Sequence, residues 1–409
     1  MEHLSRPVRR NIRLYYTYGF LMQFGLWSGI WIKYLLDDRG LELKWILAMD
    51  LPFWLLVAAL QAPTGALADR VGRKPVMALG SVLFALTILG FGFTTNYWML
   101  FFDYVLWAIA MSLYMGADSA LVYDSLRENG QESQFAKIAG RGFGAQLLAG
   151  MLGVALGGFF ATWTSLALTV QVSAITPLLA MGVALAMHEA PLERKQQHYW
   201  QGLKGAMSFA WKNPPVRYTL LIGSVMLTGV FGPVVLVQPF LLEHDVSTSL
   251  FGVWQAPLRL TSVAAAFLAF QVGRRTGIWT VLVVASAGVI GSYAGLWLFD
   301  TSAAFAFFGI SALMAGITRP LIDTYLNERI PSEMRATVLS VMQLFFSLQV
   351  AFFEPALGFF ADGISLAAAF IFAAIFFAAI MPPLLLLWMR ANRQTPVEKP
   401  GQRETVATR

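Results

Sequence analysis

Apolar stretches long enough to cross a lipid bilayer, which takes about 20 residues as a helix, recur along the whole of this sequence. Hydrophobic residues make up 57% of the chain and charged residues 13%, about half the share of charge in a soluble domain. A soluble core cannot enclose that much apolar surface. The sequence therefore predicts an all-α membrane protein that crosses the bilayer many times.

We expect twelve transmembrane helices in two six-helix bundles. The predicted spans are 12–36, 45–68, 75–93, 98–126, 137–160, 165–187, 216–242, 249–271, 278–299, 303–327, 336–361 and 366–389. The predicted domains are an N-terminal bundle at 1–187, a cytoplasmic linker at 188–213, a C-terminal bundle at 214–390 and a disordered cytoplasmic tail at 391–409. Aromatic and basic residues mix in the linker sequence HYWQGLKGAMSFAWKN, which favours an amphipathic helix on the inner leaflet. A plain linker explains the same segment equally well.

The basic residues indicate the orientation. With these spans, most of the 29 Lys and Arg residues fall on one side, and positive charge is retained on the cytoplasmic side. We therefore expect both termini in the cytoplasm, and the N-terminal MEHLSRPVRRNIRLYY reads as a retained tail rather than a signal peptide. The net charge of +6 does not predict nucleic-acid binding, because the bases are scattered between apolar runs.

A charged turn, GALADRVGRK, joins the second and third predicted spans. It resembles the signature cytoplasmic loop of the major facilitator superfamily, Gly-x-Leu-Ala-Asp-Arg-x-Gly-Arg-Lys. The matching positions are Gly65, Leu67, Ala68, Asp69, Arg70, Gly72, Arg73 and Lys74. A partial second copy at 268–274, and a repeat of GFFA at 158–161 and 358–361, lie at nearly the same offset. They indicate two bundles related as a pseudo-twofold repeat.

The resemblance implies a secondary active transporter of the bacterial inner membrane, not an enzyme, with a small-molecule substrate, protons as the coupling ion, lipid around it and a monomeric state. In this family the residue matching Asp69 meets the start of the eleventh helix, here near Arg335, and latches the two halves in the outward-open state. The resemblance also implies that Arg73 pairs with Asp124. The alternative is that these charges merely set the topology.

Charged residues within the predicted spans are a second signal, because a charge at the bilayer centre costs at least about 3 kcal/mol. The candidates for proton coupling or substrate binding are Glu354, Arg259, Asp50, Arg319, Asp118 and Arg141. Glu354 is our first candidate for the proton site because the following Pro355 leaves a carbonyl unpaired nearby. Asp50 is the second, and Arg259 would modulate the proton site or meet an anionic substrate. Satisfied ion pairs or wet interfacial positions explain the residues near span ends, including Asp103.

The walls of the central chamber in this family come mainly from spans one, four, seven and ten. On these spans the candidate lining residues are Gln23, Trp27, Trp31, Trp107, Met111, Met115, Phe231 and Gln238. A wall of aromatic and Met side chains with few polar groups suits a hydrophobic or amphipathic solute. Packing against lipid or within the core explains these stripes equally well.

We expect no cofactor and no metal site, because the chain has no cysteine and its four histidines lack helical pair spacing. The favoured function is proton-coupled efflux, although Val154 stands where drug:proton antiporters usually carry a proline and the fourth span has no arginine. An importer of an organic solute, a lipid flippase on the same fold and a non-transporting membrane sensor remain alternatives.

Overall fold

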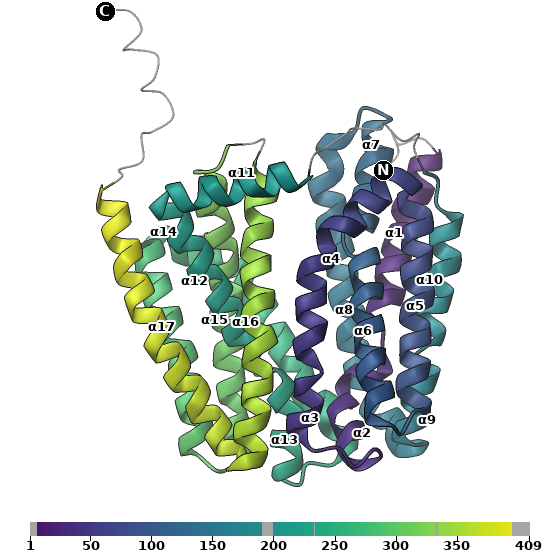
Figure 1. The fold of residues 1–409 in the computed structure, drawn as a ribbon, viewed down its shortest axis with the longest axis vertical. Helices are drawn as coiled ribbons and strands as arrows, with labels where there is room; N and C mark the ends of the chain where they lie inside the picture. The colour runs from purple at the N-terminus through teal and green to yellow at the C-terminus, as the bar shows by residue number, and fades with distance from the viewer. Residues whose placement is uncertain (1–5, 190–198, 233, 332–333, 395–409) are drawn as a thin grey trace, which may run out of the picture.

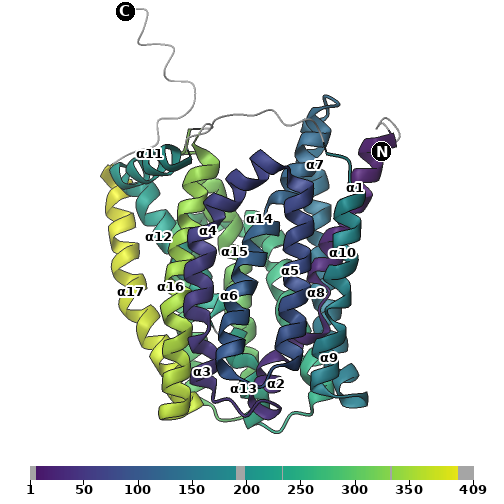
Figure 2. The same ribbon diagram turned by 45° about the vertical axis from the view of Figure 1, so that its right-hand side comes forward.

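The computed structural model describes residues 6–189, 199–232, 234–331 and 334–394, and in these ranges its regular structure is entirely helical. Two groups of long helices lie side by side (Figures 1 and 2). The first group contains α1 (Arg6–Gln23), η1 (Leu26–Gly29), α2 (Trp31–Asp37), α3 (Leu43–Ala48), α4 (Asp50–Val71), α5 (Arg73–Phe93), α6 (Tyr97–Tyr114), α7 (Ala117–Arg127), η2 (Glu132–Gln134), α8 (Phe135–Trp163), α9 (Leu166–Val172) and α10 (Ile175–Ala186). The second group contains α12 (Pro214–Phe231), α13 (Val234–Glu243), η3 (Thr248–Leu250), α14 (Phe251–Leu298), η4 (Ser302–Phe305), α15 (Ala306–Asn327), α16 (Arg335–Gly363) and α17 (Leu366–Gln394).

Ten helical stretches of the described residues are long and apolar enough to cross a membrane. The difference from the twelve predicted spans has two sources. Residues 12–36 are divided among α1, η1 and α2, so no single helix covers the first predicted span. The predicted spans 249–271 and 278–299 fall within one stretch, Thr248–Leu298.

Gly277 marks the boundary between those two predicted spans. Its backbone has φ 79° and ψ 153°, which interrupts the helical conformation inside α14. A residue with a Cβ adopts such a positive φ at a steric cost, whereas glycine does not. The chain therefore bends at Gly277, and α14 consists of two helices joined without a loop.

The linker helix α11 (Tyr199–Lys212) lies across the second group at the end of the molecule that we call the linker end (Figure 1). Ala206 and Ala210 are buried on the side of α11 that packs against α16 and α12. Lys204 and Trp211 are exposed, so α11 has the two faces of an amphipathic helix. Linker residues 190–198 lie outside the described residues.

Helix α17 extends beyond residue 390, where the sequence predicted the end of the second bundle. It continues to Gln394 with Arg393 in its last turn, a position where a basic side chain stabilises the negative end of the helix dipole. The remainder of the predicted tail, residues 395–409, lies outside the described residues.

The two groups make close contacts at the end opposite α11, along a surface that we call the seam. There Gln238 Oε1 accepts hydrogen bonds from the backbone N–H groups of Ile32 at 3.0 Å and Lys33 at 3.2 Å. Lys44 N donates to Asp362 Oδ2 at 2.6 Å. The polar atoms of Gln238 thus bind the backbone of the other group, and its side chain is buried.

Glycine permits close approach of the two backbones across the seam. A Cβ on Gly252 of α14 would lie 2.6 Å from the carbonyl oxygen of Ala155 in α8, well inside van der Waals contact. The backbones of α14 and α8 can pack this tightly only because no side chain separates them.

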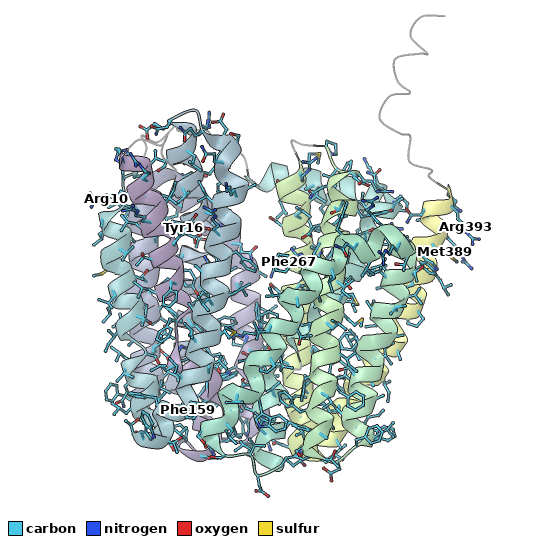
Figure 3. All side chains as sticks on the ribbon, turned by 180° about the vertical axis from the view of Figure 1, so that it is seen from behind. Arg10, Tyr16, Phe159, Phe267, Met389 and Arg393 are labelled. Carbon is cyan, nitrogen blue, oxygen red and sulfur yellow. The ribbon has the colours of Figure 1, made fainter. Side chains whose placement is uncertain are left out.

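The linker end differs from the seam. Asp69 at the end of α4 has a side chain that is 62% exposed, and it pairs with Arg73 of its own group at 3.7 Å. Arg335, at the start of α16, donates to the carbonyl oxygen of Asn327 in the second group at 3.0 Å. Among the described residues, no hydrogen bond or ion pair therefore joins Asp69 to the start of α16, so the latch that the resemblance implies for the outward-open state is not formed between them. Phe267 of α14, which borders the first group in the linker half of the molecule (Figure 3), is 80% exposed.

We expect Gly252→Val to open the seam, because overpacking of a tight contact costs about 1–3 kcal/mol. The chain has no cysteine, so a Lys44→Cys/Asp362→Cys pair can report the closed seam by disulfide formation. Gly252→Val should slow that reaction several-fold. Gly291→Val in the same helix is the control, since nothing lies within 4 Å of its Cβ position. Equal rates in the two variants would contradict this account of the seam.

Candidate functional site

Two buried carboxyl groups meet where the two groups of helices come together. Asp50 begins α4 and Glu354 lies in α16, and the two residues are 6% and 2% exposed. Their carboxyl groups are in hydrogen-bonding contact. Trp54 Nε1 also donates to Glu354 Oε2 at 3.1 Å, whereas Asp50 Oδ2 has no donor among the described residues. Because a carboxylate only accepts, the contact between the acids is a hydrogen bond only when one of them carries a proton.

Local sequence explains how each acid is held. Asp50 lies in the first turn of α4, where the positive end of the helix dipole favours a carboxyl group. Glu354 precedes Pro355 inside α16, and proline supplies no N–H for the carbonyl of Ala351. Each group of helices thus contributes one acid from a rigid helical position.

Three aromatic rings lie on the linker side of this carboxyl pair. Trp54 follows Asp50 by one turn of α4, and Phe346 precedes Glu354 by two turns of α16. The rings of Trp54, Phe231 and Phe346 contact one another in edge-to-face geometry, with centroid separations of 6.0, 5.4 and 5.4 Å. Trp54 and Phe346 are buried, but Phe231 is 48% exposed. We call these three residues the ring cluster.

Arg259 does not reach the carboxyl pair: no ion pair joins it to either acid among the described residues. Its guanidinium crosses from α14 to α8, where it occupies the space that a Cβ on Gly150 would fill. The backbone carbonyl of Gln23 lies close to the same position. Arg259 therefore belongs to the contact between the groups, and its role in substrate binding remains a prediction.

The other charged candidates lie apart from the carboxyl pair. Arg319 pairs with Asp323 one turn along α15 at 2.9 Å. Asp118, in the first turn of α7, accepts a hydrogen bond from the N–H of Ser119 at 2.7 Å. Arg141 is exposed on α8. Asp103 packs against the backbone of Gly90, where a Cβ would lie 2.7 Å from its Oδ1.

The predicted chamber residues have several environments. Trp27 and Trp107 contact each other edge to face at 5.3 Å, and Trp31 and Met111 are half-buried. Three residues are exposed, namely Gln23, Met115 and Phe231. Sequence reasoning missed Trp54 and Phe346, and the signal that could have found them is their helical spacing from Asp50 and Glu354.

The charged turn after α4 has a defined geometry. Gly72 adopts φ 112°, and Arg73 begins α5 directly after it. The Arg73 guanidinium forms an ion pair with Asp124 of α7 and also donates to the carbonyl oxygen of Ala120 at 2.5 Å. Glu189 caps the start of α5 by accepting from the backbone N–H of Arg73. The contact between Arg73 and Asp124 is present as the resemblance implies, while its gating role remains a prediction.

Comparison with known proteins gives a family match and similar structures. The family model described as Major Facilitator Superfamily matches residues 15–353. The multidrug transporter MdfA of Shigella boydii serotype 4 (strain Sb227) is 27% identical over 281 residues, which cover 64% of this chain and 66% of that protein. MdfA of Edwardsiella ictaluri (strain 93-146) is 25% identical over 285 residues with the same coverage. The chain thus spans slightly less than two thirds of the length of these relatives.

Among solved structures, a bacterial homolog of the human lysosomal transporter Spinster, in an inward-facing and unoccupied conformation, has a TM-score of 0.76. That structure is 16% identical, with 96% of this chain and 100% of the other covered. The nucleoside transporter NupG has a TM-score of 0.72 at 15% identity, with 95% and 99% covered. At this identity the likeness concerns the fold alone.

We expect a double-mutant cycle with Arg73→Gln and Asp124→Asn to give a coupling of about 1 kcal/mol, the upper range for partly exposed ion pairs. The two side chains are 20% and 36% exposed, so solvent screens the pair only in part. The measurement is thermal or denaturant unfolding of the purified protein, with Arg319→Gln and Asp323→Asn as a matched pair elsewhere. Additive effects at Arg73 and Asp124 would show that the contact contributes nothing to stability.

Proposed function

Because the chain belongs to the Major Facilitator Superfamily, we propose that it exports a small hydrophobic or amphipathic solute across the bacterial inner membrane in exchange for protons. The observation on which this proposal depends is the pair of buried acids, Asp50 and Glu354, one from each group of helices. The multidrug transporters among its relatives support the solute class. The protein itself is a multi-pass membrane protein.

The proposed architecture has twelve crossings in two six-helix bundles. Counting the two parts of α14 on either side of Gly277 as two crossings, and α1, η1 and α2 as one broken crossing, adds two to the ten continuous stretches. The distribution of basic residues supports the linker end as the cytoplasmic side. With the seam closed and the latch of Asp69 unformed, the structure then corresponds to a conformation open toward the cytoplasm.

Proton coupling follows from the chemistry of two acids in contact. Two carboxylates side by side in a site of low dielectric repel strongly, so at least one proton has to be present while the seam is closed. Opening the seam separates Asp50 from Glu354, because each moves with its own group. Each acid is then exposed to water on the side of the membrane opposite the linker end, where it can exchange its proton. Alternating access and proton exchange thereby become linked steps.

The ring cluster is the proposed contact for the solute. Phe231 presents an exposed aromatic face beside two buried rings, and such a face binds flat apolar or cationic compounds without demanding a fixed set of hydrogen bonds. The cluster also lies directly beside the carboxyl pair through Trp54, which donates to Glu354. A bound solute can therefore influence the proton site through one shared side chain.

We expect Glu354→Gln to reduce proton-driven transport at least about tenfold, since the amide still accepts from Trp54 but carries no acidic proton. Transport of a fluorescent lipophilic cation would be measured in proteoliposomes with an imposed pH gradient. Downhill exchange of the same compound without a gradient should persist, which separates coupling from folding. Asp300→Asn is the control, because that carboxylate is 95% exposed. Uphill transport by Glu354→Gln at the normal rate would rule out this coupling site.

Phe231→Ala should weaken the apparent affinity for an aromatic solute by up to about tenfold, the value of one or two aromatic contacts. The expected effect is on KM, while the dependence on the pH gradient should be unchanged because both acids remain. Phe93→Ala, which removes a ring that is 68% exposed at the end of α5, is the matched control. An equal change in the two variants would argue against the ring cluster as the solute contact.

A further inference from the structure

Three arginines in the first turns of α1 line a cavity at the linker end. Arg9, Arg10, Arg13 and Leu14 line this cavity, which is open to solvent and has a volume of about 370 Å³. A second cavity of about 530 Å³ shares Arg10 and is bounded by Pro7 and by Ala186, Met187 and His188 at the end of α10. Among the described residues, no ion pair joins an acid to any of the three guanidinium groups. The surface is therefore strongly basic, and none of the described acids neutralises its charge.

The opposite side of α1 is fixed to the rest of the first group. Asn11 is 1% exposed, and its Nδ2 donates to Ser125 Oγ at 2.7 Å and to the carbonyl oxygen of His188 at 2.6 Å. Its Oδ1 accepts from the N–H of His188 at 2.8 Å. These bonds hold α1 against α7 and the end of α10, so the arginines are presented from a rigid support.

Below the arginines, the same face of α1 becomes apolar. Helical spacing carries the stripe from Arg10 and Arg13 through Thr17 to Phe20 and Phe24, and the last two rings stack at 5.8 Å. The rise of a helix places Phe24 roughly 20 Å from Arg10, which is comparable to the depth of one leaflet. Figure 3 shows Arg10 at the linker end of α1, on the edge of the molecule away from the second group.

We propose that this surface binds a phospholipid with an anionic headgroup. The phosphate lies among Arg9, Arg10 and Arg13, where guanidinium groups supply paired donors that match phosphate oxygens. The acyl chains lie along the apolar stripe from Leu14 to Phe24. A free phosphate ion would use the basic residues alone and would leave the apolar stripe without a role, so the continuous surface favours a lipid. Basic pockets between transmembrane helices bind such headgroups for the same physical reason.

The test measures thermal unfolding of the full chain in neutral detergent micelles doped with phosphatidylglycerol, phosphatidylcholine or neither, and separately with inorganic phosphate. We expect phosphatidylglycerol to raise the unfolding temperature and phosphatidylcholine to have a much smaller effect. Arg10→Gln/Arg13→Gln should increase the phosphatidylglycerol concentration for half of the shift about thirtyfold, the loss expected for two cationic contacts with an anionic lipid.

The matched control is Arg390→Gln/Arg393→Gln, which has the same spacing and the same loss of charge. These two arginines are exposed near the end of α17, and Figure 3 shows Arg393 at the same end of the molecule as Arg10. The control should keep the response to phosphatidylglycerol. The single variant Arg10→Gln alters the residue shared by both cavities. It should raise the phosphatidylglycerol concentration for half of the shift about fivefold, and it replaces the double variant in the test if that variant does not fold.

Two outcomes would overturn the proposal. An equal rise in the phosphatidylglycerol concentration for half of the shift in the α1 and α17 variants would mean that stabilisation depends on net charge and not on this site. Stabilisation by inorganic phosphate as large as that by phosphatidylglycerol would identify a free anion as the ligand. The proposal does not depend on the transport function, because it is measured by binding, so its failure and that of proton coupling are distinguishable.

Discussion

A carboxyl group removed from water has to be neutral or matched by a partner, because an isolated buried charge is too costly to keep. Asp50 and Glu354 meet this requirement through each other, with one hydrogen bond from Trp54. Each acid belongs to a different group of helices, so the match exists only while the seam is closed. In the proposed cycle, the seam therefore stays closed only while the carboxyl pair holds a proton.

The seam depends on small residues and backbone contacts, and among the described residues no ion pair between side chains joins the two groups there. Gly252 lets α14 approach the backbone of α8, Gly150 leaves space for Arg259, and Gln238 binds two backbone N–H groups of the other group. Contacts of this kind require a precise fit but little burial of charge.

The sequence was sufficient to predict a helical membrane protein, because a chain with these long apolar runs and so small a share of charged residues fits few other classes of protein. It also located the contact of Arg73 with Asp124, since the family resemblance pairs the arginine of the motif with an acid at the inner end of the fourth span. It identified Asp50 and Glu354 as unusual but could not bring them together, because residues about 300 apart leave no local pattern. Trp54 and Phe346 escaped notice for a different reason: aromatic residues are common in apolar runs, so their helical spacing from Asp50 and Glu354 becomes informative only once the two acids are known to meet.

Helix α11 is packed on α16 and α12, so it travels as part of the second body and not as a tether between the two. The first body holds the chain as far as His188 and Glu189, which bond to Asn11 and to the start of α5. About ten residues then lead to Tyr199, where α11 begins, and a fully extended chain of that length spans at most roughly 35 Å. The covalent connection therefore sets an upper bound on how far the two bodies can separate at this end.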